Sequence, residues 1–229
     1  MSSLLADSCN AILRDFIIEA ATTPERGLEA QRLRHQVYCV ERGFQEIADG
    51  GVEADAFDVH SVHALVIHRA SGNAIGAVRL VLPDGGNRDF SFPLQKVCSI
   101  PLGNHTTLER TAEVSRLAIS KQRLMGIKAP PALLRLALLR AVVMLSAQRS
   151  LTHWCAVMEP TLLRLLAGSG IHFVQLGGLV EYHGLRQPCC AKIAQMLARV
   201  RREQPDVWTF VTADGKFDMF AETQASEAA

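Results

Sequence analysis

The stretch VHALVIHRASGNAIGAVRLVL, residues 62–82, decides the fold. Two apolar runs, 62–68 and 75–82, flank a short turn that contains Gly72, which is the pattern of a β-hairpin. The second run is apolar on both of its faces and is interrupted by Arg79. A strand of this kind is typical of the interior of a sheet, where Arg79 would need an anionic partner. The alternative is an edge strand that leaves Arg79 in water.

A further strand is expected over residues 112–119, where Glu113 and Arg116 interrupt another apolar pattern. The two charges are three positions apart, so strict alternation would send them to opposite faces of a sheet. A β-bulge between them would bring both side chains to one side, and bulges are frequent beside active sites. A regular strand, with Glu113 paired elsewhere for structural reasons, is the alternative.

Residues 22–25, TTPE, carry the signals of a helix start: a threonine cap, a proline in the first position and an acid in the first turn. The helix is predicted to continue to Arg42 and to end at Gly43. One stripe at helical spacing is expected to face the core and consists of Leu33, Val37, Val40 and Phe44. The neighbouring stripe consists of Arg34, Tyr38 and Glu41. A solvent-exposed Arg–Glu pair is the alternative interpretation of this second stripe.

The other elements complete an α/β pattern. Helices are expected at 1–14 (or a loose arm), 130–149, 160–168 and 188–203, strands at 16–20, 151–158, 171–176 and 207–212, loops at 45–60 and 90–110, and a closing turn at 83–89. The polar end, 222–229, is expected to be a disordered tail, which leaves a single domain over 1–221.

Composition narrows the function classes. The chain has 229 residues, of which 48% are hydrophobic, and a net charge of +1, which argues against broad nucleic-acid binding. The start, MSSLLADSCN, lacks the features of a signal peptide, so the cytoplasm is the expected compartment. The most apolar segment, 129–146, contains Arg135 and Arg140, which favours a helix packed on a sheet over a transmembrane segment. The six cysteines show no C-x-x-C spacing and no histidine at ligand spacing, so free thiols and no metal site are expected.

Taken as a set, several charged and aromatic positions resemble the signature of bacterial acyl-homoserine-lactone (autoinducer) synthases. They are Arg34, Tyr38, Phe44, Asp55, Asp58, Arg79, Glu113, Ser115 and Arg116. That family usually has Phe and Trp where this chain has Tyr38 and Phe44. The segments VYCVERGF (37–44), EVSRLAIS (113–120) and EYHGLRQP (181–188) are more similar to PEP-CTERM/exosortase-system-associated acyltransferases, which are related to long-chain N-acyl amino acid synthases.

The resemblance implies an acetyltransferase-like (GNAT) fold, in which a central, splayed, mixed β-sheet flanked by helices holds an acyl chain between its strands. It also implies N-acyl transfer from an acyl-carrier protein, or from acyl-CoA, to the amine of an amino acid or a related small molecule, without a metal or a bound cofactor. In this scheme Glu113 is the candidate base and a backbone N–H near Ser115 is the candidate oxyanion donor. Arg34 and Arg116 would hold Glu113 ionised, and one of the arginines would clamp the acceptor carboxylate.

The resemblance gives the other positions supporting roles. Asp55 and Asp58 would pair with Arg79 to fix the loop that closes the acceptor pocket, and Tyr38 and Phe44 would line that pocket or the acyl entrance.

The donor-binding loop is expected after the 112–119 strand. Acetyltransferases of this fold bind the CoA pyrophosphate with Q/R-x-x-G-x-G/A, and this chain has a partial match formed by Arg123, Gly126 and Lys128. The missing final small residue favours a carrier protein, whose pantetheine carries one phosphate. Two basic surfaces are candidates for docking an acidic carrier protein: Lys121, Arg123 and Lys128, or Lys192, Arg199, Arg201 and Arg202. A solvated helix face is the alternative for the second surface.

Three other functions remain open at this level. They are an acetyl-CoA-dependent N-acetyltransferase, an acyl-homoserine-lactone synthase and a catalytically silent acyl-binding module.

Overall fold

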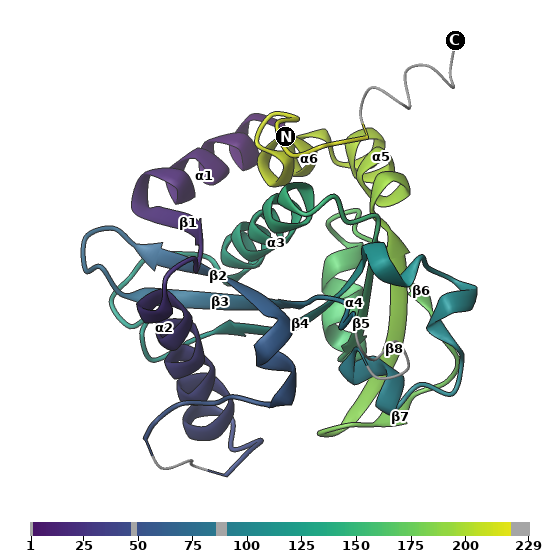
Figure 1. Cartoon of the computed structure of the whole chain (residues 1–229). Helices are drawn as coiled ribbons and strands as arrows, with labels where there is room; N and C mark the ends of the chain where they lie inside the picture. The colour runs from purple at the N-terminus through teal and green to yellow at the C-terminus, as the bar shows by residue number, and fades with distance from the viewer. Residues whose placement is uncertain (1, 47–49, 86–90, 221–229) are drawn as a thin grey trace.

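The chain folds into a mixed eight-stranded sheet with helices on both sides (Figure 1). The structure is a computed structural model that describes residues 2–46, 50–85 and 91–220. The strands are β1 (Phe16–Ala20), β2 (Ser61–His68), β3 (Ala74–Val81), β4 (Thr111–Ile119), β5 (His153–Met158), β6 (Val174–Gln175), β7 (Val180–Glu181) and β8 (Leu185–Lys192). The α-helices are α1 (Ser2–Asp15), α2 (Pro24–His35), α3 (Pro131–Gln148), α4 (Pro160–Ala167), α5 (Ile193–Glu203) and α6 (Pro205–Thr212).

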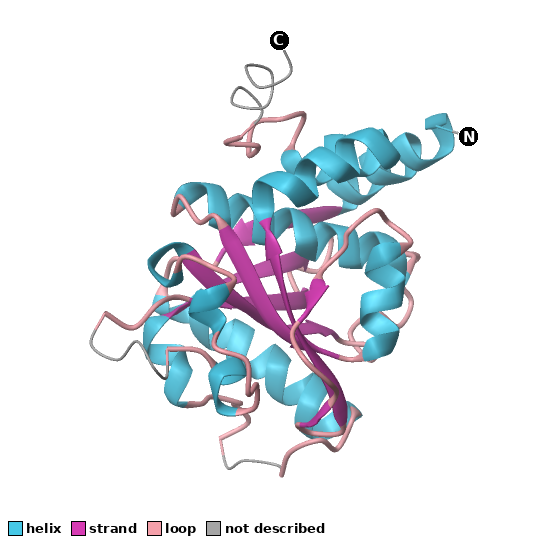
Figure 2. Ribbon diagram, turned by 90° about the vertical axis from the view of Figure 1, so that its right-hand side faces the viewer, coloured by secondary structure: helices cyan, strands magenta, loops and turns pink. Residues whose placement is uncertain are grey.

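The sheet has two halves that separate in the middle. Strands β1 to β4 pair antiparallel in chain order, and β5 pairs antiparallel with β8. The two halves meet through a parallel pairing of β4 and β5 that covers only three residue pairs, from Thr111↔His153 to Glu113↔Cys155. Beyond Glu113 the two strands separate. This splayed mixed sheet, covered by helices on both sides (Figure 2), confirms the predicted fold class.

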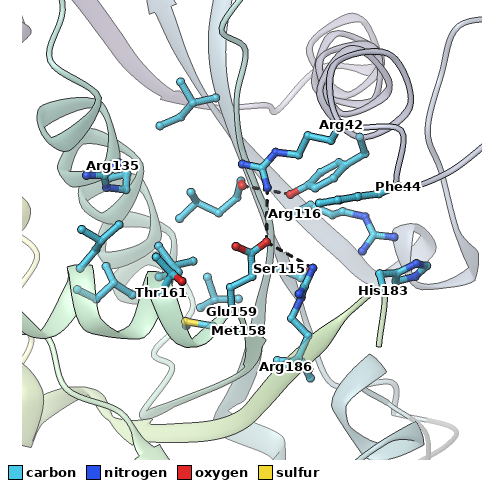
Figure 3. A pocket seen from close by; sticks show the side chains of 18 of the residues that line it. Arg42, Phe44, Ser115, Arg116, Arg135, Met158, Glu159, Thr161, His183 and Arg186 are labelled. Atoms are coloured by element: carbon cyan, nitrogen blue, oxygen red, sulfur yellow. Dashed lines mark hydrogen bonds and ion pairs between the residues drawn. The ribbon is translucent and has the colours of Figure 1, made fainter. Parts of the chain in front are cut away.

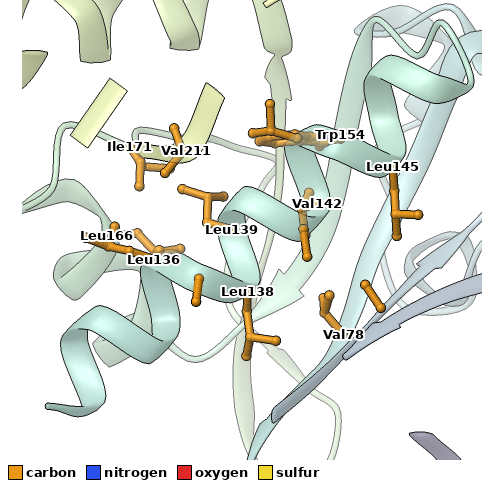
Figure 4. Packing of buried hydrophobic residues seen from close by; sticks show 14 of the residues in the cluster. Val78, Leu136, Leu138, Leu139, Val142, Leu145, Trp154, Leu166, Ile171 and Val211 are labelled. Carbon is orange, nitrogen blue, oxygen red and sulfur yellow. The ribbon is translucent and has the colours of Figure 1, made fainter. Parts of the chain in front are cut away.

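Helix α3 forms the centre of the core. Its apolar residues pack against the sheet on one side and against α1 and α6 on the other. Figure 4 shows Leu138 and Val142 of this helix in the core, with Val78 of the sheet and Val211 of α6 in the same cluster. Trp154 on β5 is fully buried and donates its indole N–H to Ser146 Oγ at 2.8 Å. This helix is also long and apolar enough to cross a membrane, but 61% of its 18 residues are buried inside the fold. Contacts on both sides therefore account for its composition.

The first predicted helix changes its winding where the sequence was expected to stay regular. Helix α2 ends at His35 and continues as a π-helical turn, η1 (Gln36–Glu41). The wider turn shifts the side-chain direction along the chain, so the prediction that Val40 and Phe44 face the core is wrong. Val40 is 50% exposed and Phe44 is 41% exposed.

Two elements near the C-terminus also differ from prediction. The predicted helix 188–203 begins only at Ile193, because residues 185–192 form β8. The predicted strand 207–212 belongs to helix α6, whose buried Val207, Phe210 and Val211 follow helical spacing toward α3. The predicted strand 171–176 is reduced to β6. The predicted tail at 222–229 and residues 86–89 of the predicted turn lie outside the described residues.

Candidate active site

A β-bulge marks the place where β4 leaves β5. Arg79 on β3 lies opposite Ser115, and Ala77 lies opposite Ala118, so two residues, Arg116 and Leu117, face a single residue of β3. Arg116 has a φ of 51°, a left-handed conformation that is uncommon for a residue with a side chain. The bulge lets Glu113 and Arg116 line the same cavity, although they are three positions apart.

Six ionised side chains behind this bulge form what we call the charged cluster: Arg34, Arg79, Arg116, Glu53, Asp55 and Asp58. Arg34 is fully buried, donates from Nε to Glu53 Oε2 and uses both terminal nitrogens on the two oxygens of Asp58. The cluster contains three positive and three negative charges, so its formal charges cancel. Such complete pairing is what buried ions require.

The other two arginines of the charged cluster close the network. Arg79 donates to Asp55 at 2.7 Å and to Ser115 Oγ at 3.0 Å. Arg116 donates from Nη2 to Glu53 and to Asp55, each at 2.9 Å. Arg79 Nη2 is buried and has no hydrogen-bond partner among the described residues. One buried donor is therefore left over in an otherwise satisfied network.

A capping motif connects the acidic loop, residues 53–58, to this network. Asp55 accepts the N–H of Phe57, and its own N–H donates to Asp58 Oδ2 at 2.7 Å, at the start of the short helix η2 (Ala56–His60). Burial alone would raise the pKa of the Asp58 carboxyl, but hydrogen bonds from His63 and Arg34 outweigh it and hold that pKa well below its usual range. The acidic loop is thus ionised and fixed at neutral pH.

Glu113 stands outside this balance of charges. Its side chain is 2% exposed and accepts the N–H of Leu94 at 2.7 Å. No arginine in the described part of the chain lies within ion-pair distance of it. Burial raises the pKa of Glu113 to about 7, against the lowering effects of the Leu94 N–H and of the charges on Arg79 and Arg116. A carboxyl with such a pKa can accept and return a proton near neutral pH.

A cavity of about 380 Å³ fills the gap between the separated strands (Figure 3). One end is polar and aromatic, with side chains from η1, the β5–α4 junction and the β7–β8 hairpin. The other end is mainly apolar and lies among α3, β5 and α4, where Arg135 and Thr161 also line it; its apolar residues include Leu139, Val142, Val157, Leu162, Leu165 and Leu166. Glu113 and the bulge also line this cavity, which can therefore hold an apolar chain with its reactive end beside a titratable carboxyl.

The structure divides the predicted site residues into three groups. Tyr38, Phe44, Glu113, Ser115 and Arg116 line the cavity. Arg34, Arg79, Asp55 and Asp58 lie behind the cavity wall, in the charged cluster. Arg123, Gly126 and Lys128 do not line the cavity. The Nη1 atom of Arg123 instead donates a hydrogen bond to the Ala74 carbonyl oxygen at 3.0 Å.

Sequence reasoning gave no role to four residues at this site. Glu53, which joins Arg34 to Arg116, heads the same acidic segment as Asp55, and that position was a signal for it. Arg42, Glu159 and Arg186 come together at the polar end of the cavity from three separate elements. No spacing in the sequence connects these three positions.

The loop after β4 offers few free N–H groups to a phosphate. Glu41 accepts the N–H groups of Lys121 and Gln122 as well as the Ser120 hydroxyl. The N–H groups of Leu124, Met125 and Ile127 bond within the loop, and the following Pro130 and Pro131 have none. This loop therefore differs from a regular anion-binding nest.

Within the described ranges no group of three His, Cys, Asp or Glu side chains is arranged to hold a metal ion. The described cysteines are free thiols.

Comparison with known proteins gives the class of the fold and of the enzyme. A sequence model of the acetyltransferase (GNAT) domain matches residues 33–125, which contain η1, the acidic loop, the hairpin and β4. The sequence matches no curated protein. Together with the splayed sheet, the match supports an acyltransferase with a GNAT fold.

Solved structures with the same fold include synthases that transfer acyl groups. FeeM, an N-acyl amino acid synthase from uncultured soil microbes, is 13% identical with a TM-score of 0.59, over 80% of this chain and 93% of that chain. BjaI, a CoA-dependent acyl-homoserine lactone synthase solved with SAM and isopentyl-CoA, is 18% identical with a TM-score of 0.60, over 87% of this chain and 99% of that chain. The AHL synthase LasI is 17% identical with a TM-score of 0.58, over 76% and 87% of the two chains.

Proposed function

We propose that the chain is an N-acyltransferase that moves a long-chain fatty acyl group from an acyl-carrier protein to the amine of an amino acid or a related small molecule. The observation that carries this proposal is Glu113, a buried carboxyl with a pKa of about 7 in a cavity that is polar at one end and apolar at the other. Amide formation needs a base at this point, because an ammonium ion has no free electron pair for attack.

The reaction follows from these groups. Glu113 takes a proton from the acceptor ammonium, directly or through a water, and the free amine attacks the thioester carbonyl carbon. The C–N bond forms, and the carbonyl oxygen becomes an oxyanion stabilised by a backbone N–H at the bulge near Ser115. The C–S bond then breaks and the thiolate leaves. Glu113 returns its proton to the thiolate, and the carboxylate that results takes the second proton from the new amide nitrogen and passes it to solvent. The charged cluster acts as a positioning unit: it keeps the backbone of the bulge in place and sets the electrostatic field at Glu113.

The apolar end of the cavity suits the acyl chain. It is lined by aliphatic side chains of α3 and α4, among them Leu139 and Leu165. Each methylene buried there contributes about 0.8 kcal/mol, so a long chain gains far more than an acetyl group does. This is the feature that favours long-chain transfer over the acetyl-CoA alternative.

The loop after β4 supports a carrier-protein donor. CoA presents a diphosphate and a further phosphate, and most N–H groups of this loop are already bonded to Glu41 or within the loop. A carrier-protein pantetheine presents one phosphate, which makes a smaller demand on such a loop. We propose Lys121 and Lys128, both exposed beside this loop, as part of the docking surface for the acidic carrier protein. Arg199 and Arg202, in the other predicted surface, are paired with Glu203.

The setting of the reaction is proposed from the same resemblances. We propose that the enzyme acts in the cytoplasm, where its carrier-protein substrate would occur, as one acyltransferase domain over 1–221. The similarity of residues 37–44 and 181–188 to PEP-CTERM/exosortase-system-associated acyltransferases supports a role of the product in such a system. An exosortase gene beside this one in the source genome is the expected finding, and its absence from that genome would contradict this role.

Mass spectrometry of lipid extracts tests the reaction directly. A bacterial host that expresses the chain is expected to accumulate a series of N-acyl amino acids, and a host that expresses Glu113→Gln is not. The masses would identify both the acceptor and the preferred chain length. Equal amounts of amide from the two proteins would contradict the role of Glu113, and no amide from purified wild-type protein with acyl-carrier thioesters and a full amino-acid panel would contradict the proposed reaction.

A further inference from the structure

Three charged side chains meet at the polar end of the cavity without forming a close ion pair (Figure 3). We call Arg42, Glu159 and Arg186 the mouth. Arg42 Nη1 lies 3.6 Å from Glu159 Oε1, and Arg186 Nη2 lies 3.4 Å from the same oxygen. Charge-assisted hydrogen bonds between such groups usually measure about 2.7–2.9 Å. One carboxylate thus holds two guanidinium groups loosely, and the mouth keeps one uncompensated positive charge.

The backbone around the mouth positions Arg186 closely. The turn between β7 and β8 has two successive left-handed residues, His183 at a φ of 52° and Gly184 at 93°. A Cβ atom on Gly184 would lie 3.1 Å from Arg186 Nη1, so glycine leaves the space that this guanidinium occupies. The Phe44 ring lies beneath both arginines, with its centroid 5.6 Å from the guanidinium carbon of Arg42 and 6.0 Å from that of Arg186. Both cations are therefore oriented by an aromatic ring.

The arginines expected to bind the acceptor carboxylate are occupied elsewhere. Arg34 is fully buried and uses its nitrogens on Glu53 and Asp58, and it does not line the cavity. Arg116 donates to Glu53 and Asp55. If either arginine moved to bind a substrate, it would break these buried ion pairs, which is costly.

We propose that Arg42 and Arg186 bind the free carboxylate of the acceptor, while the acceptor amine lies toward Glu113 in the same cavity. The inference rests on the proposed acyltransfer and narrows its substrate class to amines that carry a carboxylate, excluding their esters and amides. Two guanidinium groups from different elements match the two oxygens of a carboxylate. Glu159 balances part of their charge in the empty site and competes with the entering anion.

The pantetheine phosphate of the donor is the other anion that fits this chemistry. The position of the mouth beside Phe44, at the end of the cavity opposite the apolar chain site, favours the acceptor. The experiment below separates the two sources.

Isothermal titration calorimetry with product analogues tests carboxylate binding at the mouth without turnover. The probes are N-dodecanoylglycine, which has a free carboxylate, and N-dodecanoylglycinamide, its neutral counterpart. The wild-type protein is expected to bind the carboxylate at least tenfold more tightly, and the double variant Arg42→Gln/Arg186→Gln is expected to bind both probes with nearly equal affinity. Glu159→Gln is expected to raise the affinity for the carboxylate probe several-fold and to leave the affinity for the amide probe unchanged. Arg202→Gln, an exposed arginine on α5, is the matched control and should leave the ratio unchanged.

The outcomes distinguish the proposal from the proposed function. Equal binding of the two probes by the wild-type protein would overturn the mouth while leaving acyl transfer intact. Binding of neither probe, together with no amide product, would overturn both. A third arm compares pantetheine 4′-phosphate with pantetheine. A charge preference that appears in this pair alone, and disappears in the double variant, would assign the mouth to the donor and overturn its role in acceptor binding.

Discussion

The charged cluster and the mouth use the same chemical groups to opposite ends. In the charged cluster, three arginines face three carboxylates at hydrogen-bond distance, and Arg34 and Arg79 are completely buried. In the mouth, two arginines share one carboxylate at 3.4 and 3.6 Å, and the Glu159 side chain is 40% exposed. The difference shows that burial and complete pairing make ions structural, whereas exposure and incomplete pairing leave them available to a ligand.

Glu113 lies between these two regions and shares the behaviour of neither. It is as buried as the charged cluster, yet it has no paired cation in the described part of the chain. Burial without pairing raises its pKa, while burial with pairing lowers the pKa of Asp58. The site thus contains a fixed frame of balanced charges and one carboxyl that can gain or lose a proton near neutral pH.

The largest effect should come from breaking the charged cluster. Arg34→Met removes one partner of a buried network and leaves the charged cluster with one excess negative charge, so the free energy of unfolding should fall by about 3–5 kcal/mol. Arg42→Met, the matched change in the mouth, should cost less than about 1 kcal/mol because its ion pair is long and partly exposed. Urea unfolding at pH 7 measures both. Equal losses in the two variants would contradict the division between the regions.

An effect of intermediate size is expected from Glu113 as the pH changes. Its folded pKa of about 7 exceeds the ordinary value of 4.5, so the folded state holds this proton more tightly than the unfolded chain does. The stabilisation is complete below pH 4.5 and is lost as the pH rises through 7. Burying the ionised form therefore costs roughly 3 kcal/mol at pH 8, and Glu113→Gln should unfold less readily than wild type there by about that amount.

The pH dependence of that difference distinguishes the charge from packing. At pH 4.5 and below, wild type and Glu113→Gln should have nearly equal free energies of unfolding, because both side chains are then neutral and both accept the Leu94 N–H. Asp7→Asn, at an exposed carboxylate of α1, is the control and should show no such difference. A Glu113→Gln variant that is less stable than wild type at pH 8 would contradict the raised pKa.

The smallest effect on stability should come from the carboxylate of the mouth. Glu159→Gln should change the free energy of unfolding at pH 7 by less than about 1 kcal/mol, because Glu159 is solvated and its two ion pairs are long. Thermal unfolding in low and high salt checks this. A loss of several kcal/mol would show that the mouth is part of the structural frame.

The sequence predicted the frame of the fold better than its details. Short apolar runs in 62–82 and 112–119 identified β2, β3 and β4, because strands buried on both faces show a nearly continuous apolar pattern. It did not identify β8 or α6, because Gln187–Ala191 and Val207–Thr212 are short apolar runs in which helix and strand patterns are alike. The π-helical turn at Gln36–Glu41 has no composition signal of its own.

The candidate site was predictable only where its residues follow one another in the chain. The acidic segment containing Asp55 and the Glu113–Arg116 pair could be proposed from their spacing and from resemblance. Arg42, Glu159 and Arg186 could not, because they meet only after three distant elements pack around one cavity. The missing partner of Arg79 Nη2 is likewise visible only in three dimensions.

The pH dependence of acyl transfer tests the central claim that Glu113 is a buried base poised near neutrality. With purified protein and a saturating acyl-carrier thioester, kcat/KM for the acceptor should rise with pH through a midpoint near 7, and Glu113→Gln should lose about 10²- to 10⁴-fold in rate and lose that midpoint. A wild-type profile without a midpoint near 7, or a Glu113→Gln variant that keeps near-normal turnover, would contradict the account.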